Sequence, residues 1–385
     1  MLGRLVMPAL FITAIWGTVH FILLAVIIFL PFSRTIYRAV VDMVEWMWIT
    51  NASALIELVA GVQITVTGDS LLTGDKHILV ICNHNNRLDW MFLWCLAARL
   101  GLCSSLKIVL KESLRKAPFF GWAMQAFLFV FFSRSDRERD LDRLRLVLSH
   151  SIGHGDNVAL LLFPEGTDLS PSNQKKDADF ARAKGLEMYE KTLHPRTAGF
   201  VEAIKGFTNA GRLDAIYDVT VRYDNHPAVA MSSDPRPSEK SALIGGLWPT
   251  AVHFRCERHG GDALRGVLGE SSGAADWLSA RWQAKEKRLR DDAKQAQATP
   301  GSGASSEGEA VAWGARPTIK YLMVMASWFA LSAMLCYALM VSQGGWMLRA
   351  YTLFGVAALA AATQFGGLDG LEYFWHRARR QQKTA

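Results

Sequence analysis

Hydrophobic residues in this chain of 385 residues gather in a few long runs. Residues 8–30, PALFITAIWGTVHFILLAVIIFL, contain no charged side chain. About 20 apolar residues suffice for a helix to cross the ~30 Å hydrocarbon core of a bilayer. The run is too long for the core of a signal peptide, and no small-residue cleavage site follows it. We therefore expect an uncleaved membrane anchor over residues 1–38.

Two further apolar runs, residues 321–341 and 350–366, lie near the other end of the sequence. The polar stretch SQGGWMLR separates them, so they predict a transmembrane hairpin within residues 317–385. Basic residues follow the first span and flank both outer ends of the hairpin. Because positive charge concentrates on the cytoplasmic side, we expect a multi-pass protein whose central region and both hairpin ends face the cytoplasm.

From about residue 63 the pattern changes to short apolar runs separated by longer, helix-like stretches. Runs of about four to eight apolar residues bounded by polar clusters are typical of buried parallel strands. Over residues 63–276 the pattern predicts an α/β domain with a mostly parallel central sheet flanked by helices. The clearest candidate strands are KHILVIC (76–82), AFLFVFF (126–132), NVALLLF (157–163) and AIYDVTV (215–221).

Two segments connect the domain to the membrane runs. Residues 39–62 mix tryptophan and aliphatic side chains with three acids, too polar for a span and too apolar for a free surface helix. We expect a helix that lies at the membrane interface or packs against the domain. Residues 277–316 predict a charged helix, over 277–297, and then a linker rich in Gly, Ser and Ala.

Net charge and cysteine content limit the classes of partner and of structural framework that this protein can have. A formal net charge of +7 favours anionic lipid, phosphorylated substrates or nucleic acid. The cations cluster at membrane flanks and in one helix of mixed sign, without a basic stripe interleaved with aromatics, so we discount nucleic acid. The five cysteines form no CxxC pair and no zinc spacing, and their odd number argues against a disulfide framework.

A polar cluster follows each of three candidate strands. Asn83-His84 follows the first strand, Ser133-Arg134 the second, and the stretch PEGTD, residues 164–168, the third. Ligands of open α/β sheets bind outside the carboxyl ends of the strands. We therefore expect the three clusters to converge on one site.

His84 and Asp89 are the candidate acid–base pair. On one continuous helix, five residues would separate them by about 140° around the axis, and they could not touch. The helix must then begin between them, with Asp89 in its first turn, where the helix dipole favours a carboxylate. Asp89 would hold one ring nitrogen and leave the other as a general base. In the alternative, His84 only caps the helix and Asp89 pairs with Arg87 or Arg99.

Arg134 comes directly after a strongly apolar run. An arginine at the end of a buried strand can clamp a phosphate, because its guanidinium bonds two oxygens at once. The alternative is a surface arginine paired with Asp136 or Glu138.

The stretch FPEGTD and one lysine complete the candidate substrate site. Gly166 lets the backbone approach a ligand, and Thr167 can bind an anion or a hydroxyl. Glu165 could orient an arginine or a substrate hydroxyl. Lys111 adds positive charge ahead of an aromatic run, and we include it among the substrate-binding residues.

Other chemistries have little support in the sequence. It contains no GxSxG, HExxH, Walker or GxGxxG motif. His150 and His154 have the spacing of two metal ligands on one helix face, but a third ligand at suitable spacing is missing. We expect no metal and no cofactor.

The motifs NHNNRLDW, FFSR and FPEGTD, in this order, resemble those of the lysophosphatidate (1-acylglycerol-3-phosphate) acyltransferase family. The stretches KESLRKAPFFGWAMQ, HPRTAGF and RWQAKEKRLR are similar to its lysocardiolipin and lysophosphatidylinositol branch. The resemblance covers about residues 63–295.

The stretch DVTVRY, residues 218–223, lacks the proline usual in the fourth motif, and we assign it no ligand role. The roles that the resemblance implies are catalysis by His84 and Asp89, and binding of the acceptor's phosphate and glycerol by Arg134, Glu165, Gly166 and Thr167.

The implied reaction moves a fatty acyl chain from acyl-CoA, a co-substrate, to the free glycerol hydroxyl of lysophosphatidic acid, lysophosphatidylinositol or lysocardiolipin. The cytoplasm-facing topology and the absence of a transit-peptide pattern favour the endoplasmic reticulum membrane, with a mitochondria-associated membrane as the alternative. The alternatives are a CoA-independent transacylase, a thioesterase, or an inactive lipid-binding membrane protein.

Overall fold

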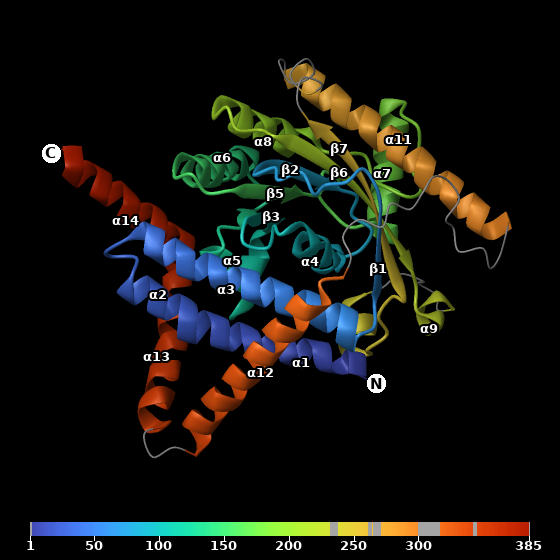
Figure 1. Ribbon diagram of the computed structural model, residues 1–385. Helices are drawn as coiled ribbons and strands as arrows, with labels where there is room; N and C mark the ends of the chain where they lie inside the picture. Colours follow the sequence, from blue (N-terminus) through green and yellow to red (C-terminus); the bar gives the residue numbers. More distant parts are fainter. Residues whose placement is uncertain are drawn as a thin grey trace.

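The computed structural model describes residues 2–231, 238–260, 264, 271–298, 316–341 and 345–384. Within these residues it contains a central sheet of seven strands in the order β1-β7-β6-β2-β5-β3-β4 (Figure 1). Neighbouring strands are parallel except for β6 and β7, which are antiparallel. The predicted mostly parallel sheet is therefore confirmed. The strands are β1 (Gln63–Gly68), β2 (His77–Cys82), β3 (Leu106–Lys111), β4 (Val130–Phe132), β5 (Val158–Leu162), β6 (Ala215–Asp224) and β7 (Ala251–Gly260).

One predicted strand is shorter than the sequence indicated. Only the last three residues of AFLFVFF form β4, because the helix α5 (Phe120–Ala126) extends into this run. The amides of Leu128 and Phe129 donate to carbonyls in the last turn of α5, and Leu128 has a φ of +58°. These bonds close the helix and turn the chain sharply before the strand begins.

Helices cover both faces of the sheet and bury two hydrophobic clusters. Alternate residues of the central strand β2 point to opposite faces, with Ile78 and Val80 in one cluster and Leu79 and Ile81 in the other. The second cluster lies against α6 (Arg137–Gly153), α8 (Thr197–Asn209) and α11 (Ser271–Ala298). The first lies against α3 (Arg34–Ala54), α4 (Asp89–Leu100) and α5. Because β2 is buried on both faces, its sequence is a continuous apolar run.

The N-terminal run forms one continuous helix made of η1 (Leu2–Leu5), α1 (Val6–Ile15), the π-helical η2 (Trp16–Ile22) and α2 (Leu23–Ile28). It lies beside α3 along the domain (Figure 1). Helix α3 and the short η3 (Leu55–Val59) pack against the domain, where Lys107 Nζ lies 3.3 Å from Glu45 Oε2. Residues 39–62 therefore pack against the domain, and their placement at the membrane interface stays a prediction.

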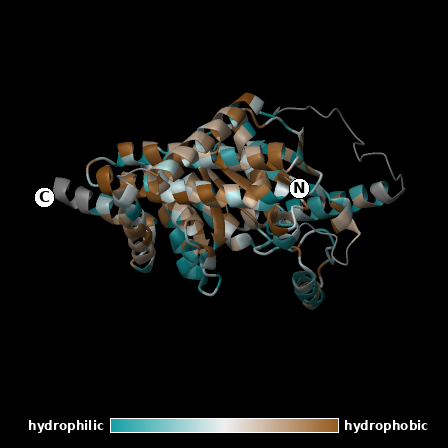
Figure 2. Cartoon of the chain, turned by 90° about the horizontal axis from the view of Figure 1, so that it is seen from below, coloured by the Kyte–Doolittle hydropathy of each residue, from teal (hydrophilic) through white to brown (hydrophobic). Residues whose placement is uncertain are grey.

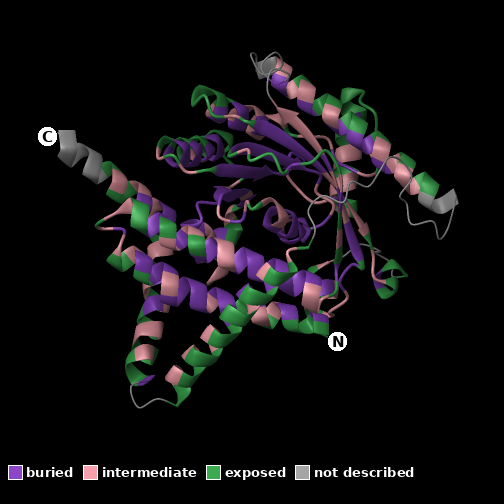
Figure 3. Ribbon diagram, in the orientation of Figure 1, coloured by how far each residue is buried: buried purple, intermediate pink, exposed green. Residues whose placement is uncertain are grey.

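Among the residues that the structure describes, three helices are long and apolar enough to cross a membrane: Leu2–Ile28, α12 (Thr318–Met340) and α13 (Gly345–Gln364). The hairpin of α12 and α13 projects from the domain and is largely exposed, whereas more than half of the N-terminal helix is buried (Figure 3). Hydrophobic residues predominate on these helices (Figure 2). An exposed apolar surface of this extent fits a bilayer and not water, as expected of a membrane protein.

Both ends of the hairpin are fastened to the domain. The hydroxyl of Tyr321, near the start of α12, donates to Glu57 at 2.8 Å. After α13, helix α14 (Gly367–Thr384) returns to the domain, where Asp369 forms ion pairs with Arg115 and Arg143. Both ends of the hairpin are therefore next to the domain. The remaining short elements are η4 (Glu112–Lys116), α7 (Pro171–Lys184), α9 (Pro227–Ala230) and η5 (Lys240–Ile244).

Candidate active site

The three polar clusters converge, as the strand pattern predicted. The chain beyond the carboxyl ends of β2, β4 and β5 borders one cavity of about 880 Å³. The residues that line it include His84, Arg134, Gly166, Thr167 and Lys111. Parallel strands present their carboxyl ends at the same edge of a sheet, which is why segments far apart in the sequence meet here.

Asp89 is the first residue of α4, and His84 precedes the helix. His84 Nδ1 lies 2.9 Å from Asp89 Oδ2, and the Asp89 side chain is fully buried. The same oxygen accepts the backbone N–H of Asn86 at 3.1 Å, while Asp89 Oδ1 accepts the hydroxyl of Tyr223. The helix thus begins between the two residues, as the angle argument required.

The alternative partners of Asp89 are engaged elsewhere. Arg99 binds both carboxylate oxygens of Glu57, each at 2.6 Å. Arg87 is mostly exposed, and its Nε lies 3.7 Å from Asp168 Oδ1. The alternative in which Asp89 pairs with Arg87 or Arg99 is therefore wrong.

The imidazole of His84 is held from several sides. It stacks on Phe163, with 4.4 Å between ring centroids. The backbone N–H of His84 donates to Glu165 Oε1 at 3.2 Å, and its carbonyl accepts the N–H of Leu169 at 2.9 Å. Asp89 occupies Nδ1, and within the described chain Nε2 has no hydrogen-bond partner. A side chain so placed at the cavity wall can accept a proton at Nε2.

Glu165 does not line the cavity, contrary to the expectation that it binds substrate. Its buried carboxylate accepts the backbone N–H of His84, the backbone N–H of Leu193 at 3.1 Å and the indole N–H of Trp282 at 3.2 Å. Burial raises the pKa of Glu165 to about 7. The side chain points away from the cavity and joins the loops at His84 and Leu193 to helix α11, because the donors available to it lie on that side.

Gly166 and Thr167 are at the cavity surface. Gly166 has a φ of +72°, and a Cβ there would lie 3.2 Å from Cδ of Arg196. Glycine therefore allows both the turn and the close approach of the arginine. Thr167 Oγ1 accepts a hydrogen bond from Asn173 Nδ2 at 2.9 Å, and its hydroxyl donates to Asp168 Oδ1 at the long distance of 3.4 Å.

Arg134 is held in a left-handed backbone conformation, with a φ of +64°. Asp140 fixes this turn, because its carboxylate accepts the N–H groups of Ser133 at 2.7 Å and Arg134 at 2.8 Å. Asp136 instead caps helix α6, and Glu138 binds Arg145. The alternative in which Arg134 pairs with Asp136 or Glu138 is therefore wrong. Strained backbone of this kind is often found at functional sites.

A second arginine, Arg196, lies beside Arg134, and sequence reasoning did not single it out. Both line the cavity, and within the described chain neither guanidinium has a carboxylate in salt-bridge contact. Burial, and then the charge of Arg196, lower the pKa of Arg134. The charges of Asp140 and Asp168 oppose this shift without forming a salt bridge to Arg134. Two adjacent guanidiniums repel each other, so an anion bound between them would be favoured. Lys111 lines the same cavity from the end of β3.

The basic residues share the cavity with Asp140, Asp168 and Glu239, and the remaining wall is mostly apolar. It is built by α1, α3, α4 and α5, and its residues include Leu10, Trp48, Trp90, Trp94, Phe120 and Met124. One cavity therefore joins a cationic end at the edge of the sheet to an apolar end beside the membrane helices. His84 of the predicted acid–base pair lines this cavity, and Asp89 lies behind it.

A model of the Acyltransferase family matches residues 63–224, which contain strands β1 to β6 and the cavity residues between them. Lysocardiolipin acyltransferase 1 of Gallus gallus is 35% identical over 282 residues, which cover 73% of this chain and 71% of that protein. The Danio rerio protein of the same name is 37% identical over 67% of this chain. This chain belongs to the acyltransferase family. Probable 1-acyl-sn-glycerol-3-phosphate acyltransferase 5 of Arabidopsis thaliana is 31% identical, over 74% of this chain and 71% of that protein.

The predicted family resemblance is thus confirmed. This acyltransferase spans 63% of the length of the Danio rerio protein, just under two thirds. Among solved structures, the 1-acyl-sn-glycerophosphate acyltransferase PlsC of Thermotoga maritima is 17% identical, covers 77% of this chain and 96% of that chain, and has a TM-score of 0.45.

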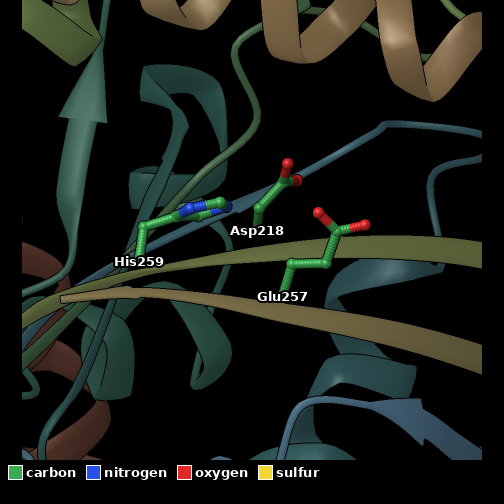
Figure 4. A group of neighbouring side chains, drawn as sticks. All are labelled: Asp218, Glu257 and His259. Carbon is green, nitrogen blue, oxygen red and sulfur yellow. The ribbon is translucent and has the colours of Figure 1, made fainter. Parts of the chain in front are cut away.

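Groups with metal-binding side chains also occur in this acyltransferase. His150 lies 3.0 Å from a carboxylate oxygen of Glu372, and His154 Nε2 lies 2.6 Å from His376 Nε2, so the two histidines contact helix α14. Another group consists of Asp218, Glu257 and His259 (Figure 4). Each offers one possible metal-ligand atom, and these three atoms lie within 4.8 Å of one another. Its two carboxylates form ion pairs with cationic side chains of α11, namely Arg281, Lys285 and Arg288. Together these ion pairs form a network that holds α11 against the sheet.

Proposed function

We propose that this protein transfers an acyl chain from acyl-CoA to the free hydroxyl of a lysophospholipid, with His84 as the general base. The observation that carries the proposal is the His84–Asp89 pair, with 2.9 Å between Nδ1 and Oδ2, at the wall of a cavity that is cationic at one end and apolar at the other. A lysophospholipid and an acyl thioester both have this division into charged and apolar parts.

The acceptor's phosphate would lie between Arg134 and Arg196, with the hydroxyl of Thr167 as a further donor. The support is that both guanidiniums line the cavity and have no carboxylate in salt-bridge contact within the described chain. Lys111, which also lines the cavity, is a candidate contact for the phosphates of CoA. Acceptors of the lysophosphatidate, lysophosphatidylinositol and lysocardiolipin kinds all carry a phosphate on glycerol. The relatives named for lysocardiolipin and acylglycerol phosphate favour the same group of acceptors.

In the proposed reaction, Nε2 of His84 takes the proton of the acceptor hydroxyl while its oxygen attacks the thioester carbon. The bond between this carbon and sulfur then breaks, and CoA leaves as a thiolate. An alcohol is about as weak an acid as water, with a pKa of ~15.7, so proton removal assists the attack. A thiol has a pKa of ~8.5 and needs no general acid to leave. One histidine therefore serves the reaction, without a covalent acyl-enzyme.

We further propose that the protein resides in the endoplasmic reticulum membrane with its domain facing the cytoplasm. The support is the distribution of basic residues around the apolar helices, together with the attachment of both hairpin ends to the domain. Acyl-CoA would then reach the cationic end of the cavity from the cytoplasm. The lipid acceptor would approach from the bilayer beside α1 and α3.

The decisive experiment compares wild-type protein with His84→Ala in membranes of cells that express each at equal amounts. Labelled acyl-CoA is supplied with and without a panel of the three acceptors, and labelled phospholipid and free fatty acid are measured. We expect acceptor-dependent phospholipid from wild type and a loss of at least 10²-fold in the variant, because general-base catalysis is worth ~10² to 10⁴-fold.

His253→Ala is the matched control, since His253 also lies 2.8 Å from an aspartate, Asp224, but does not line the cavity. It should retain activity. A His84→Ala variant within a few fold of wild type would overturn the proposed base. Free fatty acid without acceptor would indicate a thioesterase, and transfer without added acyl-CoA would indicate a transacylase.

A further inference from the structure

Tyr223 lies one residue before the end of β6, in the stretch 218–223 to which we assigned no ligand role. Its hydroxyl donates a hydrogen bond to Oδ1 of Asp89. Its ring packs on Phe92 of α4, with 5.4 Å between ring centroids. The tyrosine does not line the cavity, so it can act on the reaction only through Asp89.

The position of Tyr223 is set by the residue next to the candidate base. Asn83 forms two side-chain hydrogen bonds with Val221, donating from Nδ2 to the carbonyl at 3.1 Å and accepting the N–H at Oδ1 at 2.8 Å. These bonds hold β6 against the end of β2. Tyr223 is two residues further along the strand and therefore points to the same face as Val221.

The carboxylate of Asp89 has one set of donors for each oxygen. Oδ2 accepts from the His84 ring and from the N–H of Asn86, whereas Oδ1 accepts from Tyr223. Within the described residues Tyr223 is the donor found at Oδ1. Burial and the charge of Asp89 raise the pKa of Tyr223 well above 10, so its hydroxyl stays protonated and remains a donor.

We propose that Tyr223 is a positioning residue that fixes the carboxylate of Asp89 and thereby sets the orientation and basicity of the His84 imidazole. The proposal rests on the proposed function, in which His84 is the base. Without the phenol, the carboxylate of Asp89 can rotate about the Cβ–Cγ bond, and its charge is shared with one donor fewer. This freedom leaves the imidazole less well oriented, which lowers kcat. A carboxylate with fewer donors also stabilises the imidazolium more strongly, so the base stays protonated, and inactive, up to a higher pH.

The test measures kcat, KM for both substrates and the pH dependence of acyl transfer for Tyr223→Phe, which removes only the hydroxyl. A hydrogen bond to a charged group is large enough to change a rate about tenfold. We expect kcat to fall about tenfold, both KM values to stay within about twofold, and the acid limb of the pH profile to move to higher pH.

Tyr217→Phe is the matched control. Tyr217 also lies on β6, and its hydroxyl also binds an aspartate, Asp75, at 2.8 Å. This pair does not line the cavity. Loss of a tyrosine–aspartate bond in the same strand can lower stability in both variants, but only Tyr223→Phe should shift the pH profile.

A Tyr223→Phe protein with the kcat and pH profile of wild type would overturn the inference. An active His84→Ala variant would overturn both the proposed function and the inference. An inactive His84→Ala beside an unchanged Tyr223→Phe would overturn the inference alone. Should Tyr223→Phe not accumulate in membranes, fluorotyrosine at position 223 keeps the shape and provides a stronger donor. The acid limb should then move to lower pH, and an unmoved limb would refute the role of Tyr223.

Discussion

Replacement of Asp89 by asparagine separates the charge of this residue from its shape. The side-chain amide can direct its oxygen toward the donors on His84 and Asn86 and its NH₂ toward the oxygen of Tyr223, which can accept as well as donate. The imidazole should therefore keep its position, with Nδ1 still donating. What Asp89→Asn removes is the negative charge that faces the imidazolium formed during the reaction.

The size of the effect follows from Coulomb's law. Two opposite unit charges about 4 Å apart attract by about 4 kcal/mol at an effective dielectric constant of about 20. The Asp89 side chain is fully buried, so water cannot replace it as a partner for the imidazolium. Because ~1.4 kcal/mol in a barrier is tenfold in rate, we expect kcat to fall by about 10³-fold. KM should change little, because Asp89 does not line the cavity.

The assay is acyl transfer at saturating acyl-CoA and acceptor, in membranes with matched amounts of each variant. Asp177→Asn is the control, because Asp177 forms a similar pair with His194, at 2.8 Å, outside the cavity. That variant should stay within a few fold of wild type. If Asp89→Asn also retained activity within tenfold of wild type, Asp89 would serve only to orient the ring, and the electrostatic part of the proposed mechanism would be wrong.

Two further variants test the cationic end of the cavity and the support beneath it. Arg196→Ala should raise KM for the lysophospholipid about tenfold with little change in kcat, because a charge-assisted hydrogen bond to bound substrate is lost; an unchanged KM in acceptor titrations would exclude a phosphate contact. Burial raises the pKa of Glu165 from 4.5 to about 7, so the folded protein keeps a proton there that the unfolded chain releases. This contribution to stability is fully present below pH 4.5 and is lost as pH rises to about 7, with a span of about 3 kcal/mol. In detergent, the Tm of wild type should therefore fall relative to the Tm of Glu165→Gln as the pH rises from 5 to 8. If Tm depended on pH in the same way for both proteins, the raised pKa of Glu165 would be contradicted.

The arrangement of His84 and Asp89 could be predicted because it depends on local geometry. Five residues cannot bring two side chains together on one helix, so the contact required a helix start between them, and α4 begins at Asp89. The strand β2 could be predicted for a similar reason, since a strand buried on both faces must be apolar throughout.

The strand β4 was overestimated because helical and extended backbone can both bury a continuous apolar run. The sequence AFLFVFF contains no polar residue to mark a change of structure, and the change at Leu128 depends on hydrogen bonds to the end of α5. Strands β1, β3 and β7 were not singled out among the candidate strands. Strand β7 illustrates the reason, since charged residues alternate with its buried ones on a half-exposed surface.

The residues around the site were harder to predict than the motifs. Arg196 reaches the cavity because it packs over Gly166, thirty positions earlier in the chain. Tyr223 reaches Asp89 because Asn83 holds β6 in register with the end of β2. No local sequence pattern identifies Arg196 or Tyr223 as part of the site. Their contacts depend on which strands are neighbours in the sheet.

By itself the sequence determined the chemistry that is available and its local geometry: the apolar helices, the central α/β pattern, the acid–base pair and the family resemblance. Which of these groups line the cavity depends on the tertiary structure. In the folded protein Glu165 points away from the cavity, Arg196 lies beside Arg134, and Tyr223 contacts Asp89. The physical reason is that spacing along a chain limits contacts within one element, whereas contacts between elements depend on the order and register of the strands in the sheet.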